Sequence, residues 1–245
     1  VLKCSYGLGW PKATENVLIE NCKVSGYDPG TVYYGTYGET ITAAPDRDGP
    51  TGRIKFGTES NGGFKNVTIR NCEFKRCRGL ALETVDGAPL ENIRVSGLKM
   101  DDIWNSPIYI RIGDRMRGPK DLPASYARDI KISDVTVTNC DSRYALLIVG
   151  LPGNPVEDVT LENIHIQYKG GLTLDDVREQ RGSNPFFFGR NSGYPEPSAH
   201  GIQPARGLSM QHARNITFKN VTMELMQPDE REKTFTEDVE NFVWE

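Results

Sequence analysis

The sequence predicts an all-β fold, a parallel β-solenoid made of stacked coils. A six-residue phrase that alternates apolar and polar residues recurs six times. The shortest spacing between copies defines a short repeating unit, and no helical pattern separates the copies. Strand-rich units that repeat in this way are typical of solenoids, in which each coil packs only against its neighbours.

Each copy of the phrase begins with Asn or Asp and continues as a short strand with one buried face. The copies occupy residues 16–21, 66–71, 92–97, 129–134, 158–163 and 215–220. Their starting positions are therefore 50, 26, 37, 29 and 57 residues apart. The two shortest intervals define the unit, and the longer ones contain inserted loops.

A second alternating run follows each turn, so each coil carries at least two strands separated by Gly, Asn and Asp residues. These runs are 52–57, 79–83, 107–112, 144–149 and 207–211, and residues 1–5 resemble the same run from an earlier coil.

The repeat also sets the expected domain organisation. We expect residues 1–226 to form one β-helical domain, and the chain to be an N-terminally truncated fragment, because Val1 lacks a preceding Met and begins in mid-strand. Residues 227–245 are expected to be a C-terminal cap or tail. Long loops are expected near 33–50 and 170–206, and such insertions in solenoids tend to gather on the binding face.

Composition excludes several classes of partner and carries no signal of an oligomeric state. A net charge of -4 and a pI near 5.6 argue against nucleic-acid binding, which needs a basic surface. No run approaches the roughly 18 apolar residues that span a membrane. The three histidines, which are His165, His200 and His212, have no metal-ligand spacing, so we predict no metal and no cofactor.

The five cysteines leave two interpretations. Cys22, Cys72 and Cys140 follow Asn at equivalent repeat positions. They form either a metal or redox site, or a stack of small apolar side chains inside successive coils. The odd number and the absence of paired CxxC motifs favour the stack.

Alternation also sorts the second strands into an inward and an outward set. The inward residues are Leu2, Cys4, Ile54, Phe56, Leu80, Leu82, Ile108, Ile110 and Ile112, and the outward residues are Lys3, Ser5, Arg53, Lys55, Ala81, Glu83, Tyr109 and Arg111. Because neighbouring strands lie about 4.8 Å apart, Lys3, Lys55, Glu83 and Arg111 are expected within about 15 Å on one outer face.

This outward set is the candidate site. Like charges on adjacent strands are destabilising, and an anionic sugar ligand would relieve them while accepting hydrogen bonds from Arg and Lys. The candidate substrate-binding residues are Lys3, Arg53, Lys55, Tyr109, Arg111 and Arg115, and Glu83 is the candidate acid, base or charge partner. Aromatic side chains of the loops, Tyr34, Tyr37, Phe186 to Phe188 and Tyr194, are candidate walls for sugar rings. The alternative is an ordinary ion-paired surface in which Glu83 neutralises Lys55 and Arg111.

Several phrases together resemble glycoside hydrolase family 28, the polygalacturonases, rhamnogalacturonan hydrolases and related bacterial enzymes that act on pectin. The phrases are Gly-Thr-Glu-Ser-Asn-Gly-Gly at 57–63, Asn-Val-Thr-Ile-Arg-Asn-Cys at 66–72, Arg-Gly-Leu at 78–80, Glu-Asn-Ile at 91–93 and Ser-Pro-Ile at 106–108. The resemblance covers residues 1–168 and lies in the order of the coils more than in any one phrase.

The resemblance implies a right-handed parallel β-helix that hydrolyses galacturonan or rhamnogalacturonan with inversion. Inversion uses one carboxylic acid on the leaving oxygen and carboxylates that activate water. The family's aspartates would lie upstream of Val1. The resemblance also implies an anionic oligo- or polysaccharide partner and a secreted or periplasmic location.

Two departures indicate a divergent branch of that family. Its Gly-His-Gly motif would fall at 51–53, where the chain has Thr-Gly-Arg, and its Arg-Ile-Lys motif at 81–83, where the chain has Ala-Leu-Glu. The literal Arg-Ile-Lys stands one coil earlier, at 53–55. Two alternatives therefore stay open, a β-helical polysaccharide lyase and a non-catalytic carbohydrate-binding solenoid.

Overall fold

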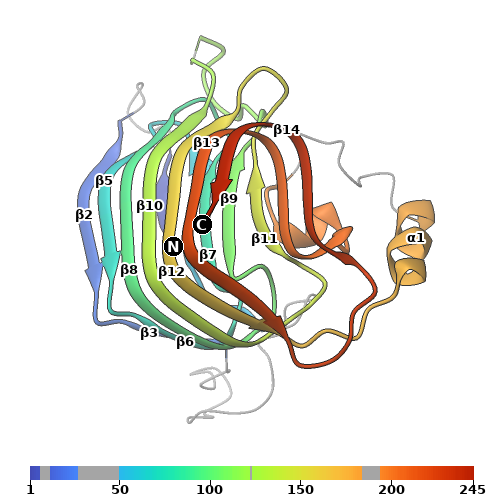
Figure 1. Ribbon diagram of the computed structural model, residues 1–245. Coiled ribbons are helices and arrows are strands. Elements are labelled where there is room, and N and C mark those ends of the chain that lie inside the picture. Colours follow the sequence, from blue (N-terminus) through green and yellow to red (C-terminus); the bar gives the residue numbers. More distant parts are fainter. Residues whose placement is uncertain (6–11, 27–49, 122, 184–193) are drawn as a thin grey trace, which may run out of the picture.

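The computed structural model describes residues 1–5, 12–26, 50–121, 123–183 and 194–245, and it is a solenoid-like stack of parallel strands (Figure 1). All pairings between its named strands are parallel. The helix α1 (Leu174–Ser183) and the short 3-10 helix η1 (Pro197–His200) are the helical elements of the described residues. The predicted all-β class is confirmed. None of the described helices is long and apolar enough to cross a membrane.

The runs predicted as second strands stack into a first row. In order along the stack they are β1 (Leu2–Cys4), β4 (Ile54–Ser60), β7 (Leu80–Thr84), β9 (Ile108–Ile112), β11 (Leu146–Val149) and β13 (Ala205–Leu225). Each hydrogen-bonds to the equivalent strand of the next coil, which is the arrangement expected of repeats that pack only on neighbours.

The Asn-led phrases form a second row. Its order is β2 (Thr14–Glu20), β5 (Phe64–Arg70), β8 (Pro89–Ile103), β10 (Tyr126–Cys140), β12 (Val156–Tyr168) and β13. Figure 1 shows these strands curving side by side from blue β2 to orange β13. The short strands β3 (Lys23–Ser25) and β6 (Glu73–Cys77) pair with each other, and β6 also pairs with β8. The last strand, β14 (Glu232–Trp244), pairs with β13, so most of the expected tail continues the sheet.

Each phrase begins and ends at a corner where the backbone is left-handed, which explains why Asn, Asp or Gly stands at both ends. The first and last residues of all six phrases have φ between 50° and 65°. Asn, Asp and Gly adopt this conformation more readily than other residues. The leading side chains also stack, since the Asn92 amide donates to Asn66 Oδ1 at 2.6 Å and the Asn66 amide to Asn16 Oδ1 at 3.2 Å.

The predicted inward residues line one continuous core, with Leu2 partly buried at its margin. This prediction is confirmed. Cys4, Cys72, Cys77 and Cys140 are buried free thiols, and Cys22 is exposed in the first described coil. The stacking interpretation therefore holds for Cys72 and Cys140, and the side chain of Cys22, although exposed, also interacts with that of Cys72.

Candidate functional site

The outward residues of the first row lie in two lines of register, and the predicted closeness of Lys55 and Glu83 is nevertheless found, since their charged groups lie 3.0 Å apart. Lys55 stands opposite Ala81, whereas Glu83 stands opposite Arg111. The neighbour of Glu83 on β4 is Gly57, where a Cβ would lie 3.4 Å from Glu83 Oε2. Lys3 is displaced as well, because the register shifts between β1 and β4, and its ammonium pairs with exposed Glu59 at 3.7 Å.

Several of the outward side chains are buried although they face away from the coil interior, whereas Lys3 is exposed. Lys55 and Arg111 are 5% exposed, and Glu83 and Tyr109 are fully buried. Residues 194–200, which we call the covering segment, make the contacts described below. These charged residues therefore lie under part of the inserted loop at 170–206, which folds back over the outer face.

Glu196 of the covering segment is the centre of the charged cluster, which we define as Arg53, Lys55, Arg78, Glu83, Asn105, Arg111 and Glu196. Arg53 donates to Glu196 Oε1 at 2.7 Å, and the Asn105 amide donates to the same oxygen at 2.9 Å. Arg78 Nη1 lies 3.8 Å from Oε1, and Lys55 Nζ lies 3.9 Å from Oε2. One carboxylate from the covering segment thus contacts three cations from two coils.

Glu83 is a second carboxyl group in the same cluster, with a different environment. Lys55 Nζ lies 3.0 Å from its Oε2, at ion-pair distance, and no other described residue donates a hydrogen bond to either carboxyl oxygen. Burial raises the pKa of Glu83 to about 8, opposed by Lys55 and reinforced by the negative charge of Glu196. Burial therefore favours the protonated form of Glu83, which is the form that a proton donor needs.

Tyr109 and His200 join the covering segment to β9. The Tyr109 hydroxyl lies 2.8 Å from His200 Nε2. Burial lowers the pKa of His200 to about 3 and raises the pKa of Tyr109, so we assign the hydroxyl as donor to a neutral imidazole. Tyr109 was predicted to be a platform for sugars, but in the closed arrangement His200 covers it.

Arg111 lies beside Glu83 at the edge of this cluster. Its guanidinium donates to the Gly150 carbonyl at 3.3 Å, and burial lowers its pKa. A cation next to the protonated Glu83 would stabilise negative charge that develops there when the proton leaves.

Arg115 lies in an adjacent open hollow instead of the cluster. Its guanidinium forms two hydrogen bonds with buried Asp86, and it also donates to the Thr58 carbonyl at 2.8 Å. The hollow has a volume of about 390 Å³ and is lined by Ser5, Thr58, Glu59, Asn61, Asp86, Arg115, Arg117 and Gly118. Ligand sites typically have volumes of about 300 to 1,000 Å³, so the hollow is large enough to hold a small ligand.

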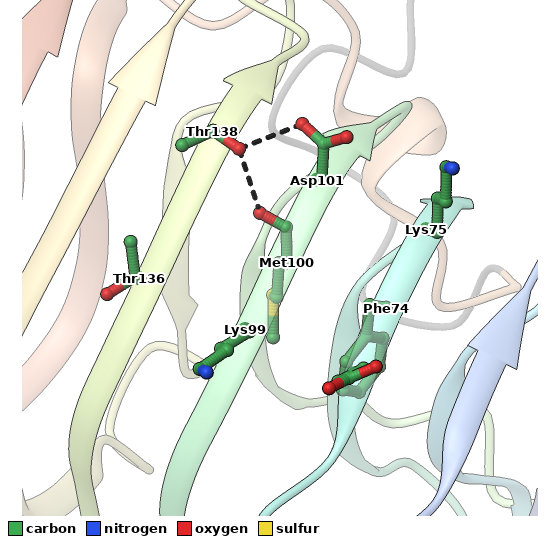
Figure 2. A pocket seen from close by; sticks show the side chains of 8 residues that line it. Phe74, Lys75, Lys99, Met100, Asp101, Thr136 and Thr138 are labelled. Carbon is green, nitrogen blue, oxygen red and sulfur yellow. Dashed lines mark hydrogen bonds between the residues drawn. The ribbon is translucent and has the colours of Figure 1, made fainter.

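A second hollow lies on β6, β8 and β10, away from the charged cluster. Figure 2 shows Asp101 and Thr138 at one end, joined by a hydrogen bond of 2.8 Å, with Lys75 and Lys99 at its margins. Asp101 also accepts a hydrogen bond from Asn139, and these bonds lower its pKa. A carboxylate held ionised in this way is a poor proton donor, and we assign no chemistry to this hollow.

Sequence reasoning missed Arg78, Asn105, Asp86, Glu196 and His200. The Tyr-Pro-Glu-Pro phrase at 194–197 was singled out for its aromatic residue, yet its carboxylate makes the contacts. Tyr194 itself is exposed, with its ring 4.9 Å from Lys55 Nζ. The other candidate wall residues, Tyr34, Tyr37 and Phe186 to Phe188, lie outside the described residues.

Within the parts of the chain that the structure describes, no group of three or more His, Cys, Asp or Glu side chains could hold a metal ion. Comparison of the chain with protein-family models, with curated proteins and with solved structures found no match.

Proposed function

We propose that this chain is the substrate-binding part of a glycoside hydrolase acting on a pectic polysaccharide or oligosaccharide, galacturonan or rhamnogalacturonan, with inversion. The observation that carries the proposal is a carboxyl group, Glu83, that is fully buried beside Lys55 on the outer face of a parallel solenoid. A uronate polymer supplies carboxylates that such cations bind, and its glycosidic oxygen needs a proton donor.

The proposal includes the finer architecture, a right-handed parallel β-helix. Parallel strands joined by a crossover within one sheet are right-handed in about 98% of cases, which supports this hand. A secreted or periplasmic location is part of the same proposal, because polymeric pectin is met outside the cell.

In this proposal Glu83 donates a proton to the leaving oxygen and Lys55 binds the uronate carboxylate. Inverting enzymes need a second carboxylate about 6.5 to 9.5 Å from the acid, with a water between them. The resemblance to family 28 implies aspartates just ahead of β1, and β1 stands two strands from β7, or about 10 Å at the usual strand spacing. The open hollow around Arg115 and Asp86 would hold a neighbouring sugar unit.

A non-catalytic carbohydrate-binding solenoid is the second candidate. The observation that favours it is the complete burial of Glu83, which cannot touch a substrate while residues 194–200 cover it.

The deciding assay follows reducing ends and near-ultraviolet absorbance together on polygalacturonic acid and rhamnogalacturonan oligosaccharides. It uses this chain and a chain extended upstream of Val1, each with and without Glu83→Gln. Release of reducing ends without absorbance, lowered at least about 100-fold by Glu83→Gln, is the expected result, since general acid catalysis contributes about 10² to 10⁴. The matched control is Glu162→Gln, an exposed glutamate paired with Lys131.

Other outcomes of the assay contradict the proposal. An unsaturated, ultraviolet-absorbing product would show a lyase. Binding without any product, from either chain, would show a carbohydrate-binding solenoid. Unchanged turnover in the Glu83→Gln variant would remove Glu83 from the chemistry.

A further inference from the structure

The charged cluster contains a formed carboxylate-binding pocket, and Glu196 of the same chain occupies it. Its partners are a guanidinium from Arg53, an amide from Asn105 and, at longer range, the ammonium of Lys55. The side chains of Arg53 and Glu196 are only 7% and 9% exposed. Hydrogen bonds between a charged donor and a carboxylate are stronger than hydrogen bonds between neutral groups. Converging donors of this kind therefore bind carboxylates well.

Side chains provide most of the attachment of the covering segment to the cluster. Lys55 Nζ donates to the Pro195 carbonyl at 3.3 Å, and Tyr109 donates to His200. The backbone hydrogen bonds at the end of the segment are local, from Ala199 N to the Glu196 carbonyl and from Gly201 N to the Ser198 carbonyl. The segment pairs with no strand in the described structure, so it can leave the cluster without breaking the sheet.

The charge balance of the cluster allows Glu196 to be exchanged for the carboxylate of a ligand. The cluster gathers Arg53, Lys55, Arg78 and Arg111 around two carboxyl groups, of which Glu83 carries no charge when protonated. Removing Glu196 alone would take from buried Arg53 the carboxylate that it contacts at 2.7 Å, which is costly. Replacing Glu196 by another carboxylate keeps the charge constant.

We infer that Glu196 is an internal stand-in for the carboxylate of an anionic ligand, and that such a ligand binds by displacing Glu196 and opening the covering segment. The identity of the ligand as a uronate rests on the proposed function. The pocket itself does not, because any small carboxylate of the right size can test it.

The first test uses acetate, which has the size of the group removed in Glu196→Ala. We expect this variant to melt below the wild type, and acetate to raise its Tm by several degrees in a saturable manner. Acetate should leave the wild type and the control variant Glu162→Ala unchanged, the latter because Glu162 lies on the surface. Equal responses of all three proteins, or none in Glu196→Ala, would overturn the inference.

The second test uses wild-type protein and Glu196→Gln, which keeps the shape of the side chain without its charge. Titration calorimetry with trigalacturonate should give at least tenfold tighter binding to Glu196→Gln than to the wild type, and maltotriose should show no such gain. Hydrogen exchange at the amides of Ala199 and Gly201 should become faster when trigalacturonate binds the wild type. Binding with unchanged or slower exchange there, or no gain in affinity, would contradict displacement.

The two proposals fail in different ways. Rescue by acetate without any binding of trigalacturonate would keep the carboxylate pocket and reject the uronate ligand. Hydrolysis of pectic substrates without rescue or displacement would keep the proposed function and reject the role of Glu196.

Discussion

The raised pKa of Glu83 should make the free energy of unfolding depend on pH, and the substitution Glu83→Gln should remove this dependence. An ordinary glutamate has a pKa of 4.5, and burial raises the pKa of Glu83 to about 8 in the folded protein. Between these values the unfolded chain has released the proton that the folded chain keeps. The contribution to stability is therefore fully present below pH 4.5 and is lost as the pH rises toward 8.

The size of this loss follows from the two pKa values. Their difference, at about 1.36 kcal/mol per pKa unit, corresponds to a loss of the order of 5 kcal/mol between pH 4.5 and 8. Whole domains are stable by only about 5 to 15 kcal/mol, so the effect is large enough to measure. The clearest window is pH 6.5 to 8, because His200 titrates with the opposite sign below it.

The assay is urea unfolding followed by circular dichroism at half-unit steps from pH 5 to 9, for the wild type, Glu83→Gln and the control Glu162→Gln. We expect the wild type and the control to lose stability as the pH rises from 6.5 to 8, and Glu83→Gln to show a flat profile there. Parallel profiles for all three proteins, or a wild type that gains stability in this window, would refute the reasoning.

Two further predictions concern His200 of the covering segment and the buried side chain of Arg231. Because burial lowers the pKa of His200 to about 3, the folded protein loses stability as the pH falls from 6.5 toward 3, and His200→Gln should lessen this loss where the surface control His165→Gln does not. Arg231 is fully buried and forms hydrogen bonds with Asp229 and with backbone carbonyls, so Arg231→Met should cost about 3 to 5 kcal/mol of unfolding free energy. The same change at Arg214, in an exposed ion pair with Glu157, should cost less than about 1 kcal/mol by urea unfolding.

The sequence was sufficient for those parts of the fold that repeat. Alternation identified the inward residues because a strand has a fixed two-residue period, and the phrase boundaries carried the residue types that left-handed corners require. Asn66 and Asn92 show both signals, since each has a positive φ and joins the stacked ladder. Local rules of this kind act within a few residues, so the amino-acid sequence alone is enough to apply them.

The candidate site depends on strand register and long-range contacts, which the two-residue alternation of the strands does not predict. Counting residues placed Lys55 beside Glu83, and their charged groups do lie 3.0 Å apart, but it is Gly57 that the register of β4 brings opposite Glu83. Glu196 is 143 residues from Arg53 in the sequence, and nothing in its local pattern indicates which part of the solenoid it contacts. The outward residues were identified correctly as a group, while their pairing and burial depended on a loop that folds back.

The charge of Glu196 influences the pKa of Glu83. In our proposal the charge of a ligand that replaces Glu196 therefore affects proton donation as well as binding. The negative charge of Glu196 raises the pKa of Glu83, so losing that charge without replacement would lower it. In our proposal a uronate replaces Glu196 and keeps Glu83 protonated, whereas a methyl-esterified sugar brings no charge and leaves Glu83 facing uncompensated cations. We therefore expect the alkaline limb of the pH profile of kcat to lie at lower pH for methyl-esterified than for free oligogalacturonide. Coincident alkaline limbs for the two substrates would show that the charge at the position of Glu196 does not control the proton on Glu83.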